Sequence, residues 1–154
     1  MMEKQKKRIL VIDNDAVILR SFKQILQHEG YSVETAENGK DAIEKSFAGH
    51  YNLALVDVRL PDFDGTKLLT QLRQTTPKMR AIIVTGFPDI TNAISAIKGA
   101  ADDYVTKPAN PDELLRVVRK HLQKQEEERE YSETKVAEYI QNRVKQLEVN
   151  DRET

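Results

Sequence analysis

The sequence predicts an α/β domain built on a doubly wound, parallel β-sheet and followed by a helical C-terminal extension. Three observations lead to this prediction. Short apolar runs that suit buried strands alternate with longer segments that have helical periodicity. Five such strand–helix pairs follow one another, and this alternation implies parallel strands with right-handed crossovers and helices on both faces. Polar residues stand directly after several of the strands, where open α/β sheets bind ligands.

The five expected strands differ in how they are covered. Arg8 to Ile12 and Leu53 to Val56 are continuous apolar runs, which are typical of strands buried on both faces. Tyr31, Val33 and Thr35 alternate with polar residues and indicate an edge strand. In chain order, the expected strands are 8–12, 31–35, 53–56, 81–84 and 104–106.

The expected helices have recognisable ends. Gly30, Gly49 and Gly99 each follow a helical segment and suit C-terminal caps. Pro88 and Pro111 suit the first turn of a helix. In chain order, the expected helices are 15–28, 38–48, 65–75, 88–98 and 111 to at least 122.

Five βα units suit a flavodoxin-like (βα)5 sheet with strand order 2-1-3-4-5, whose switch point lies between strands 1 and 3. Asp13 follows strand 1 and Asp57 follows the apolar run of strand 3, so this topology brings the two carboxylates together. Neighbouring carboxylates repel each other, and a hard cation such as Mg²⁺, which prefers oxygen ligands, relieves the repulsion. Asp57 is the most informative residue of the chain. Burying a charge at the end of a buried strand costs free energy, so the carboxylate there is expected to have a charged partner or a functional role.

Two further residues follow strands 4 and 5 at the same edge of the sheet. Thr85, followed by Gly86, could donate a hydrogen bond to a phosphoryl group or could be an ordinary strand-end residue. Lys107 could neutralise a phosphoryl oxygen or could be a solvated surface lysine. Each signal is weak alone, whereas polar residues at four successive strand ends form a strong pattern.

The composition narrows the class of protein. The chain has 154 residues, 39% of them hydrophobic, which suits one domain with a real core. A net charge of −1 gives no general attraction to nucleic acid or anionic membranes. The absence of cysteine excludes disulfide and thiol chemistry. No apolar run approaches the ~20 residues of a membrane span or the pattern of a signal peptide, so we expect a cytoplasmic protein without membrane contact.

Residues 125–154 differ from residues 1–124, which we expect to form the domain itself. The tail carries nine acids and five bases, a net −4, so the preceding part carries +3. This acidity argues against direct nucleic-acid binding by the tail. We expect the tail to be helical and to support a weak homodimer, while a solvated helix, partial disorder and the start of a longer protein remain alternatives. An apolar stripe recurs in it at helical spacing: Val136, Tyr139, Ile140, Val144 and Leu147.

The motifs at the strand ends are ILVID at 9–13, DVRLPDFDG at 57–65, VTG at 84–86 and YVTKP at 104–108. Together they resemble a response-regulator receiver domain of two-component signalling, over about residues 8–124. The flank from Gly86 to Ile90 is similar to receivers of enhancer-binding transcription activators. The sequence does not indicate the cognate kinase, the signal or the downstream target.

The resemblance implies that Asp57 accepts a phosphoryl group from a sensor histidine kinase or a phosphotransfer protein, in a Mg²⁺-dependent phosphorelay. It also implies that Asp13, Asp57 and the backbone carbonyl of Arg59 hold the Mg²⁺. The family usually has two acids after strand 1, whereas the second position here is Asn14, whose carbonyl can ligate the ion without adding charge. Asp15 could substitute, although its position also suits a helix N-cap.

The same resemblance implies roles for further residues. Thr85 and Lys107 bind phosphoryl oxygens, and Thr85 and Tyr104 switch the face formed by helix 4, strand 5 and helix 5. The Lys107–Pro108 bond is expected to be cis, a feature largely confined to proline. We expect no enzyme activity beyond self-phosphorylation and slow self-dephosphorylation.

Two other functions remain open. Residues 13–17 match the D-x-D-x-V signature of haloacid-dehalogenase-type phosphatases, in which Asp13 would be the nucleophile and Asp15 the general acid. Residues 101–103 would then supply the late acidic pair, but the turn at Asp57 would stay unexplained. A pseudo-receiver that is never phosphorylated would keep the fold and act only as a binding module.

Overall fold

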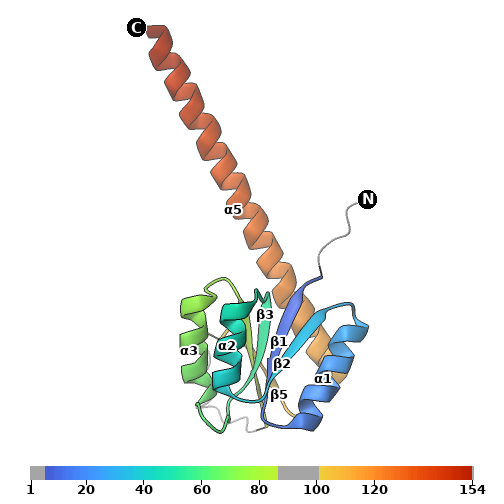
Figure 1. The fold of residues 1–154 in the computed structure, drawn as a ribbon. Helices are drawn as coiled ribbons and strands as arrows, with labels where there is room; N and C mark the ends of the chain where they lie inside the picture. The colour runs from blue at the N-terminus through green and yellow to red at the C-terminus, as the bar shows by residue number, and fades with distance from the viewer. Residues whose placement is uncertain (1–5, 87–100, 154) are drawn as a thin grey trace. The chain divides into compact units, whose positions relative to one another are not determined.

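The sheet has five parallel strands in the order β2-β1-β3-β4-β5, which confirms the predicted topology. The structure is a computed structural model that describes residues 6–86 and 101–153. The carboxyl ends of β1 and β3 lie side by side, because Ile12 pairs with Val56 (Figure 1). The strands are β1 (Arg8–Ile12), β2 (Ser32–Ala36), β3 (Leu53–Asp57), β4 (Arg80–Thr85) and β5 (Asp103–Thr106).

The described helices begin close to the predicted residues. Asp15 caps α1, since its carboxylate accepts the Val17 amide at 2.9 Å. Gly30 follows α1 with a φ of 97°, a conformation that favours glycine. The helix expected at 88–98, with its Gly99 cap, lies outside the described residues. The helices are α1 (Ala16–His28), α2 (Gly39–Ala48), α3 (Gly65–Thr75) and α5 (Pro111–Glu153).

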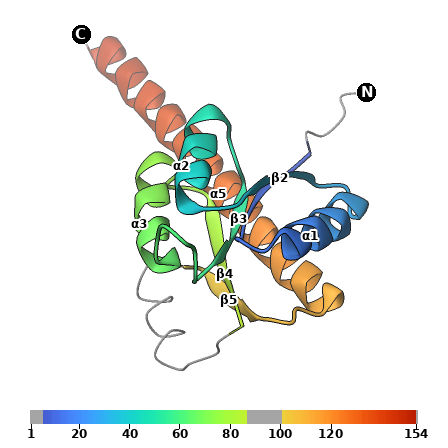
Figure 2. The ribbon, with the colours of Figure 1, turned by 60° about the horizontal axis from the view of Figure 1, so that its bottom comes forward.

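Two apolar clusters cover the two faces of the sheet. One joins the sheet to α1 and to the first turns of α5, and it includes the fully buried Leu26 and Leu114. The other joins the sheet to α2 and α3, and it includes Ala42 and Leu68. Figure 2 shows α2 and α3 on one side of the sheet and α1 on the other. Truncating a buried leucine in either cluster to alanine would destabilise the fold by about 2–5 kcal/mol.

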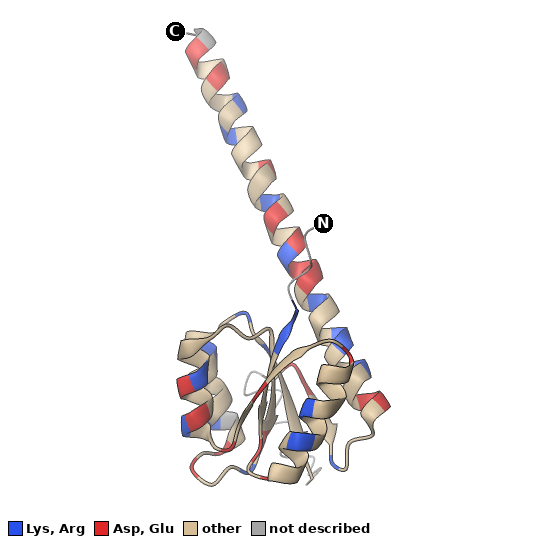
Figure 3. Cartoon of the chain, turned by 45° about the vertical axis from the view of Figure 1, so that its right-hand side comes forward, with Lys and Arg blue, Asp and Glu red and all other residues tan. Residues whose placement is uncertain are grey.

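The helix α5 is continuous from Pro111 to Glu153, so the tail is helical as expected. Packing divides the chain into two compact units, with the division between Leu122 and Gln123. In the second unit, charges of both signs line the helix (Figure 3). Arg129, for example, forms ion pairs with Glu126 and Glu133, although exposed pairs of this kind contribute little each.

Among the helices of the described residues, none combines the length and the apolar character that crossing a membrane requires.

Candidate functional site

Two buried carboxylates lie at the carboxyl edge of the sheet. Asp13 follows β1 and is 3% exposed, and Asp57 ends β3 and is 7% exposed. Lys107 follows β5 and reaches both of them. Its Nζ lies 2.6 Å from Asp13 Oδ2 and 3.5 Å from Asp57 Oδ2. One ammonium group therefore bridges carboxylates from two neighbouring strands, as the strand order leads us to expect.

The charge of Asp57 is only partly compensated. Burial is the largest influence on this carboxyl and raises its pKa above the ordinary value. The amide of Arg59, which donates a hydrogen bond to Asp57 Oδ1 at 3.2 Å, lowers the pKa. The charge of Asp13 raises the pKa and Lys107 lowers it, and the net effect is a raised pKa. A cation bound beside Asp57 would stabilise its ionised form.

The loop after Asp57 is closed tightly at its base. The Gly65 amide donates a hydrogen bond to the Val58 carbonyl at 2.8 Å, and Arg59 pairs with Asp64 in an isolated antiparallel bridge. A Cβ on Gly65 would lie 2.4 Å from the Asp57 carbonyl oxygen, so this close approach requires glycine. The closed loop keeps the Arg59 peptide beside the Asp57 carboxylate.

The structure also describes the other residues that the resemblance singled out. Thr85 ends β4 and is buried, and its carbonyl accepts the Lys107 amide at 2.7 Å. The Lys107–Pro108 peptide bond is cis, as the resemblance implies. Tyr104 lies on β5 and is 40% exposed.

The available donor atoms suit a hard cation. Asp13 and Asp57 offer carboxylate oxygens, and the Arg59 carbonyl and the exposed Asn14 amide could add neutral ones. Asp15 is less suitable, because its carboxylate caps α1. Across 6–86 and 101–153, no group of three or more acidic, histidine or cysteine side chains is placed to hold a metal. Mg²⁺ keeps several of its water ligands in proteins. A coordination shell of two carboxylates, neutral protein oxygens and water molecules therefore still suits this ion.

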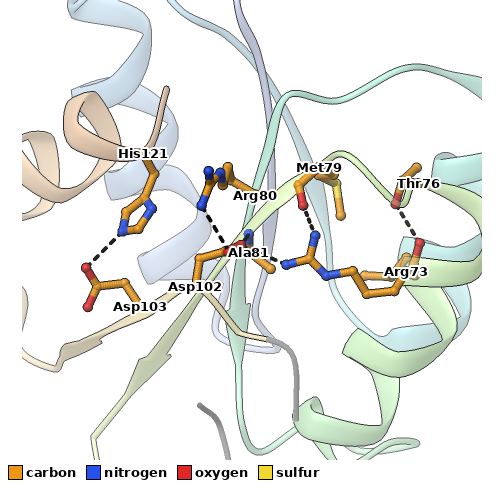
Figure 4. A network of polar contacts seen from close by, with 9 residues as sticks. Arg73, Thr76, Met79, Arg80, Ala81, Asp102, Asp103 and His121 are labelled. Carbon is orange, nitrogen blue, oxygen red and sulfur yellow. Dashed lines mark hydrogen bonds and ion pairs between the residues drawn. The ribbon is translucent and has the colours of Figure 1, made fainter. Parts of the chain in front are cut away.

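The acids Asp102 and Asp103 lie at the opposite end of the sheet. Asp103 is the first residue of β5, whereas Asp13 follows the last residue of β1, and all strands are parallel. Asp102 instead forms ion pairs with Arg73 at 2.7 Å and Arg80 at 3.2 Å (Figure 4). The phosphatase interpretation is therefore wrong, because its late acidic pair lies far from the proposed nucleophile.

Sequence reasoning missed the partner of Asp103. Its Oδ2 lies 2.9 Å from Nε2 of His121, a buried residue on α5 (Figure 4). Burial acts to raise the pKa of Asp103, but hydrogen bonds from His121 and from the Tyr104 amide, with the charge of Lys120, outweigh it and lower that pKa. The only signal in the sequence was a histidine beside Leu122 on the apolar side of a helix.

Sequence reasoning also missed a second anchor of the loop after Asp57. The carboxylate of Asp62 accepts the amides of Gly39 at 2.8 Å and Lys40 at 2.9 Å, at the start of α2. The partners are 23 and 22 residues apart in the chain, so the local sequence around Asp62 shows only a turn.

Comparison with known proteins is consistent with this geometry. A family model described as the response regulator receiver domain matches residues 9–119. The alginate biosynthesis transcriptional regulatory protein AlgB of Pseudomonas putida is 39% identical over 116 residues, which cover 75% of this chain and 26% of AlgB. The chain thus spans about a quarter of the length of that curated relative.

Solved structures agree on the fold. A CheY-like response regulator receiver domain protein from Methanospirillum hungatei is 42% identical, with a TM-score of 0.78 over 80% of this chain and 99% of that one. A response regulator from Burkholderia pseudomallei is 30% identical, with a TM-score of 0.71 over 80% of this chain and 73% of that one. Its structure contains a phosphorylated aspartic acid, a calcium ion and citrate.

Proposed function

Because the chain belongs to the family of response regulator receiver domains, we propose that it accepts a phosphoryl group on Asp57 in two-component signalling. The donor is the phosphohistidine of a sensor histidine kinase or of a phosphotransfer protein. The observation that supports this proposal best is Lys107, whose ammonium group bridges the buried carboxylates of Asp13 and Asp57.

The transfer uses positioning and charge more than covalent help from the protein. A carboxylate oxygen of Asp57 attacks the phosphorus, the new P–O bond forms, and the P–N bond to the donor imidazole breaks. Lys107 pairs with a phosphoryl oxygen, and the Thr85 hydroxyl donates a hydrogen bond to another. Asp13, Asp57 and the Arg59 carbonyl would hold a Mg²⁺ ion, which when bound would supply positive charge to these oxygens.

The full chain is expected to take up one acid-labile phosphoryl group when mixed with Mg²⁺ and acetyl phosphate. Intact-mass spectrometry measures the product, and a parallel reaction with a chelator provides the control. No covalent change under either condition would contradict the proposal and would favour the pseudo-receiver.

Asn14 is expected to weaken Mg²⁺ binding before phosphorylation. It replaces a second acid with a neutral amide, and carboxylate charge increases affinity for a divalent cation. Asn14→Asp should bind Mg²⁺ severalfold more tightly than the wild type, and beryllofluoride should narrow the difference because it restores negative charge. A Mg²⁺ titration of both proteins measures this. Equal affinities without beryllofluoride would exclude Asn14 from the site.

We further propose that phosphorylation acts through Thr85 and Tyr104. Thr85 would move toward the phosphoryl group, and the half-exposed Tyr104 ring would turn into the vacated space. The phosphoryl group would thereby shift an existing equilibrium, because it interacts differently with the two states. Amide chemical shifts should change along β5 and α5 when beryllofluoride is added, and changes confined to the Asp57 pocket would contradict the switch. The expected helix 4 of this face lies outside the described residues.

The tail is proposed to pair with the tail of a second copy. Its apolar stripe is about half exposed or more, although the surrounding helix is highly charged. A narrow apolar stripe on a charged helix is typical of helix–helix association. The stripe covers only about two heptads, so pairing of the tails alone would be weak. The stripe consists of Val136, Tyr139, Ile140, Val144 and Leu147.

Ile140→Glu is expected to abolish self-association of the full chain, because it places a charge in the apolar seam. Glu138→Ala is the matched control, since two residues along a helix point to nearly opposite sides. Sedimentation at tens of micromolar protein, with and without beryllofluoride, measures the effect. A wild type that stays monomeric in both conditions would show that the stripe has another role.

A further inference from the structure

The N-terminus of α2 is closed by side chains from two parts of the chain. Asn38 accepts the Asp41 amide at 2.8 Å, as an ordinary N-cap does. Asp62, from the loop between β3 and α3, accepts the amides of Gly39 and Lys40 with its two oxygens. The hydrogen bond from Gly39 is the largest influence on the Asp62 carboxyl and lowers its pKa, which indicates that the ionised form is favoured.

The residue after Asp62 adds an apolar contact at the same place. Phe63 is partly buried against the cluster that joins the sheet to α2 and α3. Gly39 leaves room for its ring, since a Cβ on Gly39 would lie 2.3 Å from Phe63 Cδ2 and 2.9 Å from Cγ. The tip of the loop therefore rests on the start of α2 through two hydrogen bonds to the Asp62 carboxylate and one apolar contact of Phe63.

These contacts matter because the same loop carries the Arg59 peptide. The base of the loop is closed by Gly65 and Val58, and its tip is held by Asp62. Arg59 lies between these two anchors, with its amide on the Asp57 carboxylate. If the tip is released, the segment between the anchors gains conformational freedom, and the Arg59 peptide spends less time beside Asp57.

We propose that Asp62 is a positioning residue for phosphoryl uptake, which acts by clamping the loop 58–64 onto the N-terminus of α2. The clamp keeps the Arg59 carbonyl where it can ligate the divalent cation. The clamp also requires Gly39, because a side chain at that position would collide with the Phe63 ring. This role rests on the proposed phosphoacceptor function, since it concerns the cation and the acceptor of that reaction.

Removing the carboxylate should loosen the loop and weaken cation binding together. In Asp62→Ala, the Mg²⁺ dissociation constant should rise about tenfold, as is common when a group that orients a metal ligand is lost. Hydrogen exchange at the amides of Gly39 and Lys40 and across 58–64 should accelerate in the protein without Mg²⁺. Asp62→Asn keeps one acceptor oxygen and should give an intermediate result. Glu44→Ala, which removes an exposed acid from the same helix, should change neither measurement.

Gly39→Ala tests the apolar contact of the clamp, between Phe63 and the start of α2. The added methyl group should displace Phe63 and raise the Mg²⁺ dissociation constant while the Asp62 carboxylate is still present. The double variant with Asp62→Ala should be less than additive, because both changes release the same contact. Additive effects would mean that the two residues act separately and would contradict a single clamp.

The outcomes separate positioning from simple stability and from the proposed function. A lower melting temperature for Asp62→Ala with an unchanged Mg²⁺ midpoint would overturn the positioning role. If the wild type accepts a phosphoryl group and Asp62→Ala accepts it equally fast, the clamp is wrong and the proposed function stands. If the wild type accepts none, the proposed function fails, while Mg²⁺ titration and hydrogen exchange still test the clamp.

Discussion

Asp57→Asn is expected to reduce phosphoryl uptake from acetyl phosphate to background. The amide keeps the shape of the side chain but lacks the nucleophilic oxygen that forms the P–O bond. Intact-mass spectrometry after incubation with Mg²⁺ measures the product. Glu44→Gln, which neutralises an exposed acid on α2, is the matched control and should retain uptake. Stoichiometric phosphorylation of Asp57→Asn would mean that another residue is the acceptor.

The same substitution should stabilise the fold at neutral pH, by an amount on the order of 1 kcal/mol. The pKa of Asp57 is raised in the folded state, so above that pKa the fold holds a carboxylate that it solvates less well than water does. Below the ordinary aspartate pKa, the carboxyl is neutral in both states and the penalty disappears. The gain in melting temperature should therefore shrink as pH falls through the raised pKa. A gain that is independent of pH would point to packing instead of charge.

Asp102→Ala is expected to cause the largest loss of stability among single changes of exposed or half-buried acids, about 2–3 kcal/mol. Asp102 binds the guanidinium groups of Arg73 and Arg80 and accepts the Ala81 amide at 2.8 Å (Figure 4). It therefore joins the segment before β5 to the end of α3 and the start of β4. Its loss removes a shared acceptor from two partly buried cations, which costs more than an exposed ion pair contributes.

Thermal or urea unfolding measures this loss, which corresponds to a decrease of roughly 5–10 °C in the melting temperature for a chain of this size. Asp102→Asn should lose less, because its amide oxygen can still accept the Ala81 amide. Glu44→Ala controls for the removal of an acid from the surface. A change below about 0.5 kcal/mol for Asp102→Ala, the range typical of surface substitutions, would show that the network contributes no net stability.

The arrangement of Asp13, Asp57 and Lys107 could be predicted because it depends on backbone topology. Each residue directly follows or ends a strand, and the order of parallel strands determines which strand ends are neighbours. The apolar runs and their spacing predicted five βα units, and five such units suit the order 2-1-3-4-5. The start and end of α2 were also predictable, since Asn38 and Gly49 mark them locally.

The contacts of Asp62, Asp102 and Asp103 could not be predicted in this way. Each joins residues far apart in the chain that meet through side-chain geometry, and neither periodicity nor capping rules describe such pairs. Asp103 even supported a wrong hypothesis, because an acidic pair in sequence gives no sign of which end of the sheet it occupies. His121 was missed for a similar reason, since its acceptor lies 18 residues away on β5.

The two apolar clusters described for the sheet have a consequence for how substitutions in this domain combine. The loop 58–64 packs through Val58, Leu60 and Phe63 on the cluster that joins the sheet to α2 and α3. The first turns of α5 pack in the opposite cluster through Leu114 and Val118. The two clusters have no residue in common, and substitutions at separated sites without shared partners usually combine additively. The sheet thus separates the packing of the loop 58–64 from the packing of the first turns of α5. We therefore expect that substitutions at Leu114 or Val118 leave the packing of the loop 58–64 on the other face unchanged.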